Sequence, residues 1–277
     1  MKNLVEFSRK YGSDPELVLA GGGNTSMKEN GVLYVKGSGC SLSTIHEENF
    51  VAMDLQKLLD ICTKTYPSDD RTREALFLCD VSAAKLPGEE NKRPSVEALL
   101  HALFPQRYVL HLHPALVNGL TCAVNGRETA ARLFPKAVWV DACRPGYTLA
   151  KLLSDRIGPD TDTVLLQNHG VFFASDTPEG LEFLLHHMLD TLQKQLPGLL
   201  PAELEAVDLS RPFTPDHIVY CGVGPDLPDT ENARLLYRDA QKINWYAGAF
   251  GGPLPMSREL IDFILNWEAE SYRKKQA

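Results

Sequence analysis

Hydrophobic positions recur along the chain with two different spacings, which predicts that strands and helices alternate. Short apolar runs rich in β-branched or aromatic residues are typical of strands. They cover residues 31–35, 108–113, 136–140, 163–166 and 171–173. Helical spacing is predicted for residues 2–11, 54–64, 70–84, 96–104, 114–122, 149–153 and about 176–196.

Proline and glycine positions set the expected ends of several helices. Gly12 stops the first helix, and Pro94 is expected at the first helical position of the helix that continues through residues 96–104. A polar cap with a proline just inside it, Asp176-Thr-Pro-Glu179, predicts the start of the long amphipathic helix.

The chain changes character after Pro197. It becomes proline-rich and less periodic to about Asp229, and helical patterns return over residues 229–246 and 256–275. We expect these last residues to form an extension that packs onto the core.

The candidate chemistry centres on two histidines at the end of the strand that begins at Tyr108. Side chains alternate along a strand, so His111 and His113 point to the same side. A third imidazole, His169, lies in Asn168-His-Gly170, a predicted tight turn between two strands. Three histidines with an open fourth position are typical of catalytic zinc, although ordinary hydrogen-bonded histidines would also explain the pattern.

A carboxylate lies on the predicted helix just before that strand. Glu97 and His101 are four residues apart and therefore share a helix face. Glu97 is a candidate acid/base or metal ligand. The alternative is a first-turn glutamate that compensates the helix dipole. His101 is expected to pack or to support a ligand.

Two glycine-rich segments precede these motifs, Ala20-Gly-Gly-Gly-Asn-Thr-Ser26 and Lys36-Gly-Ser-Gly39. Their backbone N–H groups and hydroxyls can surround an anion. Neither segment has the spacing of a P-loop or of the dinucleotide fingerprint, and simple turns between strands would explain them equally well.

Composition narrows the function classes. The chain has 277 residues, 44% hydrophobic and 23% charged, with a formal net charge of −8. It has no basic cluster of the kind that binds nucleic acid or an anionic membrane, and no signal sequence or membrane span is predicted. Its six cysteines lack CxxC spacing, which favours reduced thiols in a cytoplasmic enzyme.

Five motifs occur in the order seen in one known family: Gly23-Asn24-Thr25-Ser26, Lys36-Gly-Ser-Gly39, Ser95-Val-Glu97, His111-Leu-His113 and Asn168-His-Gly170. From about residue 1 to 196 the chain resembles the class II aldolase/adducin family. It is most similar to the aldolases for L-fuculose 1-phosphate and L-rhamnulose 1-phosphate, particularly the aldolase half of rhamnulose-phosphate aldolase/dehydrogenase fusions.

The resemblance implies an α/β fold with three α/β/α layers around a central, mainly antiparallel sheet. Residues 1–210 would form the catalytic domain and residues 211–277 a mainly helical extension. His111, His113 and His169 would bind Zn²⁺ or another divalent metal. Glu97 would be the acid/base, and it would ligate the metal when no substrate is bound.

The implied reaction is zinc-dependent aldehyde-lyase cleavage of a ketose 1-phosphate to dihydroxyacetone phosphate and an aldehyde. The residues expected to bind the substrate or its phosphate are Asn24, Thr25, Ser38, Gly39 and Ser95. Val96 replaces a hydroxyl residue common in the family, and Lys36 can supply a cation instead. The alternative to a phosphorylated substrate is one that carries a carboxylate, or one that carries no anionic group. A second acid/base is often a tyrosine from a neighbouring subunit, for which Tyr237, Tyr246 and Tyr272 are candidates.

Other family members leave two alternatives. Dehydratases and epimerases act on related sugar phosphates, and the glutamate at position 97 favours an aldolase over an epimerase. An adducin-like module is non-catalytic and lacks the metal ligands, which this chain keeps. Family members are commonly homotetramers, so we expect a homo-oligomer with a small-molecule sugar phosphate as its substrate, in the cytoplasm, and neither nucleic acid nor membrane as a partner.

Overall fold

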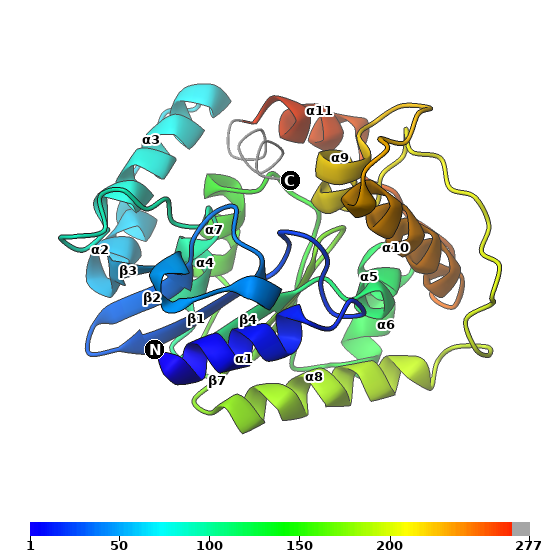
Figure 1. Ribbon diagram of the computed structural model, residues 1–277, viewed down its shortest axis with the longest axis horizontal. Helices are drawn as coiled ribbons and strands as arrows, with labels where there is room; N and C mark the ends of the chain where they lie inside the picture. Colours follow the sequence, from blue (N-terminus) through cyan, green and yellow to red (C-terminus); the bar gives the residue numbers. More distant parts are fainter. Residues whose placement is uncertain (268–277) are drawn as a thin grey trace.

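A seven-stranded sheet forms the centre of the protein (Figure 1). The computed structural model describes residues 1–267. The strands lie in the order β3-β2-β1-β4-β7-β6-β5, and only the β5–β6 pair is parallel. Their bounds are β1 Asn24–Glu29, β2 Val32–Lys36, β3 Phe50–Asp54, β4 Tyr108–Leu112, β5 Val138–Val140, β6 Thr163–Leu166 and β7 Gly170–Ser175.

Helices cover both faces of this sheet. The helices of one layer are α1 Lys2–Gly12, α5 Ala115–Thr121, α6 Gly126–Leu133 and α8 Pro178–Gln193. The other layer has α2 Leu55–Asp60, α3 Asp70–Ala83, α4 Ala98–Leu103 and α7 Tyr147–Ser154. Short 3₁₀ turns lie at Leu42–Thr44, Glu47–Asn49 and Ile61–Thr63.

The alternation of β4 separates the two cores. Tyr108, Leu110 and Leu112 pack with the α1–α8 layer, whereas Val109 packs with the α2–α7 layer. The predicted three-layer α/β/α fold with a mainly antiparallel sheet is therefore confirmed. His111 shares its side of β4 with Val109, and it stacks on Phe172 with ring centroids 4.0 Å apart.

Four elements were not predicted, and their composition explains why. In β1 the buried Asn24, Thr25 and Ser26 are polar, so no hydrophobic period marks the strand. β3 runs directly into α2, and only the helix, predicted over residues 54–64, was recognised. The helices α6 and α9 Pro215–Cys221 are only eight and seven residues long.

The predicted start of α4 was wrong. Pro94 does not open the helix, because residues 93–95 run in an extended conformation beside residues 36–38. The Ser38 N–H donates to the Arg93 carbonyl at 2.9 Å, and Gly37 forms a β-bridge with Pro94. The helix begins at Ala98 instead, with Glu97 in its cap position.

The residues after Leu196 contribute α9, α10 Glu231–Gly248 and α11 Arg258–Asn266. α10 packs lengthwise on α5, and Gly119 permits the close approach because a Cβ there would lie 2.3 Å from the Cβ of Tyr246. The predicted helix over 256–275 ends at Asn266 in the described part of the chain, and residues 268–275 lie outside the described residues.

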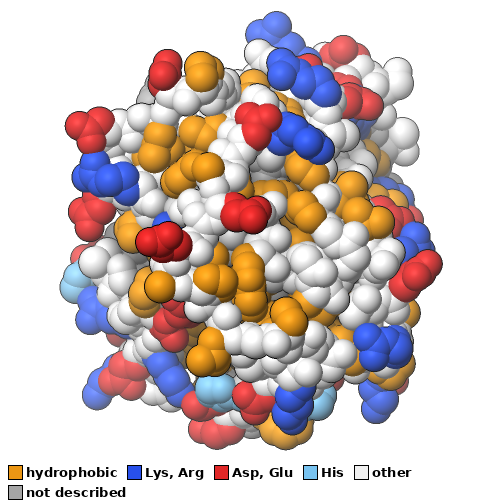
Figure 2. Space-filling view, turned by 90° about the vertical axis from the view of Figure 1, so that its right-hand side faces the viewer, with side chains coloured by type: hydrophobic (Ala, Val, Ile, Leu, Met, Phe, Trp, Pro, Cys, Tyr) orange, Lys and Arg blue, Asp and Glu red, His pale blue; other side chains and the backbone are white. Residues whose placement is uncertain are grey.

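On the side of the molecule that lies at the right of Figure 1, apolar side chains gather near the centre of the face (Figure 2). Acidic side chains are scattered among them, and basic groups lie mostly toward the margin. Within residues 1–267, no helix is both long and apolar enough to cross a bilayer.

Candidate functional site

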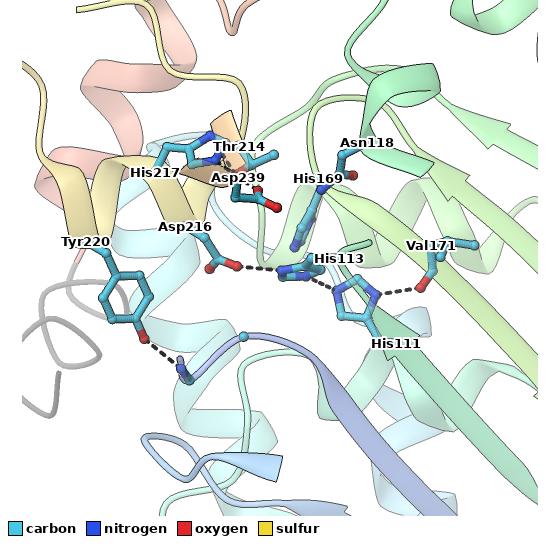
Figure 3. Close-up of polar contacts among 12 residues, drawn as sticks. His111, His113, Asn118, His169, Val171, Thr214, Asp216, His217, Tyr220 and Asp239 are labelled. Carbon is cyan, nitrogen blue, oxygen red and sulfur yellow. Dashed lines mark hydrogen bonds and ion pairs between the residues drawn. The ribbon is translucent and has the colours of Figure 1, made fainter. Parts of the chain in front are cut away.

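The end of β4 carries the two histidines predicted as ligands, and both present Nε2 to a common centre (Figure 3). His111 is completely buried, and its Nδ1 donates to the carbonyl of Val171 at 3.0 Å. His113 directs Nδ1 to the Oδ2 atom of Asp216 at 2.5 Å. Because a carbonyl and a carboxylate only accept, both Nδ1 atoms carry a proton, which leaves each Nε2 as the atom that can bind a cation. The two Nε2 atoms lie 2.9 Å apart.

The third imidazole enters from the turn between β6 and β7. Asn168 adopts a left-handed conformation (φ +58°), and its Nδ2 donates to the carbonyl of Leu254 at 2.8 Å. Asparagine tolerates this conformation better than most residues, so the turn that presents His169 is held without a glycine at that position. The following Gly170 has no room for a side chain, because a Cβ there would lie 2.7 Å from Cδ2 of His113.

Burial controls the charge of His169. Burial, together with the smaller effects of the neighbouring His111 and His113, lowers the pKa of this imidazole to about 3. His169 is therefore neutral at physiological pH, which is the form that binds a metal ion.

Glu97 lies at the cap of α4 and faces the histidines. Its Oε1 atom is 3.2 Å from Nε2 of His111 and 3.6 Å from Nε2 of His169. Its Oε2 atom accepts from Nδ2 of Asn24 at 3.3 Å. Burial alone would raise the pKa of this carboxyl, but His111 beside it holds the pKa well below its usual value. Glu97 is therefore ionised.

The donor set fits a divalent metal ion. One nitrogen from each of the three histidines lies within 4.8 Å of the others. Tetrahedral zinc with Zn–N bonds of about 2.0–2.1 Å needs ligand atoms about 3.3 Å apart. The separations of 2.9 Å between the two Nε2 atoms on β4 and 3.2 Å from Oε1 of Glu97 are close to that value. Nδ1 atoms held by acceptors are the usual arrangement for histidine ligands.

A cavity of about 50 Å³ adjoins this centre. Most residues predicted to hold an anion line it: Lys36, Ser38, Gly39 and Ser95, next to Val96 and the Gly21–Gly23 turn. Lys36 is buried and donates through Nζ to the carbonyls of Gly21 at 3.0 Å and Gly22 at 3.4 Å. It therefore also fixes the glycine turn.

Asn24 connects the cavity to the carboxylate. It donates to Oγ of Ser95 at 2.7 Å as well as to Glu97, while its Oδ1 is buried and has no hydrogen-bond partner within residues 1–267. The prediction for Thr25 was wrong. It alternates to the other face of β1, where its Oγ1 lies 2.7 Å from Oγ of Ser8 on α1.

His101 lies beneath the centre as a packed residue. Its Nδ1 is 2.8 Å from Oγ of Ser26, and its ring contacts Phe172 edge to face. Burial holds the pKa of His101 well below its usual value, so the ring is neutral.

Sequence reasoning missed two site residues, both on α9. Asp216 bonds His113, and the hydroxyl of Tyr220 accepts from the N–H of Gly21 at 3.0 Å (Figure 3). The isolated short helix gave no signal, because its residues lie about 100 positions beyond the histidine motif.

The tyrosines proposed as a second acid/base lie elsewhere. The hydroxyl of Tyr237 accepts from the N–H of Val207 at 3.4 Å, and Tyr246 packs against α5. Tyr272 lies outside the described residues. None of the described candidates lines the cavity beside the histidines.

Comparison with known proteins places these residues in context. The model of the class II aldolase and adducin N-terminal domain matches residues 2–196. An uncharacterized oxidoreductase of Bacillus subtilis (strain 168), YuxG, is 33% identical over 191 residues, which are 65% of this chain. The match covers 27% of that relative, so the chain spans about a quarter of its length.

A solved structure is similar in fold. The N-terminal class II aldolase domain of a conserved protein from Thermoplasma acidophilum is 29% identical, with a TM-score of 0.60. That similarity covers 69% of this chain and 91% of the other. The family match contains all five motifs and all three histidines, together with Glu97. The chain belongs to the class II aldolase/adducin family.

Proposed function

We propose that this protein is a divalent-metal-dependent aldolase that cleaves a ketose 1-phosphate to dihydroxyacetone phosphate and an aldehyde. The observation that carries the proposal is the convergence of three imidazole nitrogens, within 4.8 Å of one another, beside an ionised carboxylate 3.2 Å from one of them. An adducin-like module without catalysis would have no use for that donor set.

The histidines would hold the metal ion, with zinc as the expected occupant. When bound, it would act as a Lewis acid that stabilises negative charge on the substrate oxygens. The protein contributes the orientation of the β4 ligands, since each Nδ1 is fixed by an acceptor, and burial keeps His169 uncharged.

Glu97 would move the proton at carbon. Its low pKa supplies the carboxylate needed to remove a proton from the carbon next to the ketone in the direction of synthesis, and to return it after cleavage. Asn24 holds Oε2, so Oε1 is the atom that faces the reacting centre.

The cavity beside Glu97 would receive the phosphate. Lys36 supplies a buried cation there, and the hydroxyls of Ser38 and Ser95 supply donors. This set compensates for Val96, which carries no hydroxyl. We assign the unpartnered Oδ1 of Asn24 as an acceptor for a substrate hydroxyl.

A panel of ketose 1-phosphates tests the proposal. The metal-loaded chain is incubated with each sugar, and dihydroxyacetone phosphate is detected through its enzymatic reduction. Release of dihydroxyacetone phosphate from at least one sugar is expected. Loss of water, or inversion of a stereocentre without cleavage, would instead identify a dehydratase or an epimerase. No turnover of any kind by the metal-loaded chain would contradict the proposal.

We further propose that the chain forms a homo-oligomer, with a tetramer as the expected state. Light scattering behind a sizing column measures its mass in solution. A strictly monomeric chain at micromolar concentration would contradict this part of the proposal.

A further inference from the structure

The side chain of His113 is held by a residue from beyond the family match. Asp216 lies on α9, which begins 19 residues after the matched region ends at residue 196. The contact is buried on both sides, with 10% of the His113 side chain and 6% of the Asp216 side chain exposed. A charged acceptor at 2.5 Å in such surroundings forms one of the stronger kinds of hydrogen bond.

The two histidines of β4 thus differ in their support. His111 donates to a backbone carbonyl of the neighbouring strand, which the sheet itself supplies. His113 follows the last residue of β4, where its backbone N–H donates to the Leu17 carbonyl and not to a neighbouring strand, and its side-chain acceptor is a carboxylate from a distant helix. Without Asp216, nothing among these contacts would fix the tautomer of His113.

α9 is anchored independently of that contact. The adjacent residue, His217, is buried and bonds Thr214 through Nδ1 and Asp239 of α10 through Nε2, each at 3.2 Å. α10 in turn packs on α5, which begins two residues after His113. The helix that carries Asp216 is therefore fixed to the same part of the core as the histidine it contacts.

The glycine turn is shaped to admit this contact. A Cβ on Gly22 would lie 2.8 Å from Oδ2 of Asp216 and 3.2 Å from Nδ1 of His113. The neighbouring Gly21 donates its N–H to Tyr220, one helical turn after Asp216 on α9. Both glycines thus lie directly against α9.

We infer that Asp216 is a positioning residue of the metal centre, which orients His113 with Nε2 toward the ion, so that residues beyond the family match form part of the active site. The inference rests on the proposed function. Carboxylates that orient a ligand histidine also raise its basicity, and their loss typically reduces metal affinity 10–100-fold.

The alternative is that Asp216 only docks α9, as a structural ion pair would. The two cases differ in what Asp216→Asn changes. A docking pair would lower the stability of the fold and leave the affinity of the folded protein for metal unaltered. A positioning residue would lower the affinity itself.

The test uses the full chain and Zn²⁺ in competition with a chromophoric chelator. Asp216→Asn is compared with Asp239→Asn, which removes the charge from the other His–Asp contact of α9, between His217 and α10, without touching His113. We expect Zn²⁺ affinity to fall 10–100-fold in Asp216→Asn and to change less than about threefold in Asp239→Asn. Circular dichroism confirms that both variants are folded.

The outcomes separate the inference from the proposed function. A wild-type chain that binds no Zn²⁺ would overturn the metal centre and the inference with it. Wild-type binding with an unchanged affinity in Asp216→Asn, or with equal losses in both variants, would overturn the inference alone.

A second measurement needs no variant and covers the case in which Asp216→Asn does not fold. In ¹⁵N NMR of the wild-type chain loaded with Zn²⁺, His113 should show a protonated Nδ1 and a metal-bound Nε2. Coordination of the metal through Nδ1 of His113 would overturn the inference.

Discussion

Replacing Glu97 by glutamine removes a negative charge from the centre while keeping the volume of the side chain. In the native protein Oε1 faces His111 at 3.2 Å, and Oε2 accepts from Asn24 at 3.3 Å. A glutamine amide can keep its carbonyl oxygen on the Asn24 donor, but its NH₂ group then faces the histidines and offers no base to the reacting centre.

The size of the effect follows from the role assigned to Glu97. A positioned general acid/base contributes about 10²–10⁴-fold to the rate. At 1.36 kcal/mol for each tenfold change, its loss raises the barrier by about 3–5 kcal/mol. The three imidazoles remain in Glu97→Gln, so the metal ion should stay bound.

Two assays are run on the same preparation. One follows release of dihydroxyacetone phosphate from the best sugar of the panel, and the other measures metal content. We expect kcat to fall by 10²–10⁴ with close to one metal ion per chain retained. Glu182→Gln is the control, since that glutamate contacts Lys10 on the surface and should leave kcat unchanged. Unaltered turnover in Glu97→Gln would remove Glu97 from the mechanism, and loss of the metal would show that it is chiefly a ligand.

Three further predictions concern stability. Gly146→Ala should destabilise the fold by about 1–3 kcal/mol in urea unfolding, because φ is +90° and the added Cβ would clash with Oε2 of Glu74. Gly158→Ala is the control, because a Cβ there meets open space and should be nearly neutral. Burial lowers the pKa of Lys28 to about 7. Between about pH 7 and 10.5, Lys28 is therefore protonated in the unfolded chain but not in the folded chain, so the free energy of unfolding falls as the pH drops through that window. Lys28→Met should therefore raise Tm at pH 8, with a gain that shrinks toward pH 10.5; an equal gain at both values would contradict the reasoning. Removing the metal with a chelator should lower Tm, and adding Zn²⁺ should restore it; a Tm indifferent to metal would show that the folded state does not bind it preferentially.

The sequence predicted those parts of the fold whose hydrophobic period is strong. β4, β6 and β7 and the long helix α8 follow directly from it, and they place His111, His113 and His169. β1 could not be found this way, because the buried residues on one of its faces, Asn24 and Ser26, are polar. Their polar atoms are paired with Ser95 and His101, which lie more than 70 residues away along the chain.

The candidate site was predictable where residues lie close in sequence or carry a motif. Asp216 has neither advantage. Its role depends on α9 being fixed beside the glycine turn through α10, a tertiary arrangement that no local pattern encodes. The error for Thr25 has a simpler origin, since without β1 the alternation that turns its hydroxyl toward Ser8 was not visible.

X-ray absorption at the zinc edge tests the central claim most directly. The full chain, loaded with Zn²⁺ and freed of excess metal, should contain close to one zinc per chain, with about three imidazole nitrogens and one or two oxygens at about 2.0–2.2 Å. Substitution of His169 by alanine should reduce the nitrogen count and the metal content together. A spectrum dominated by sulfur at about 2.3 Å, or a chain that retains no zinc, would contradict a site built from these histidines and Glu97.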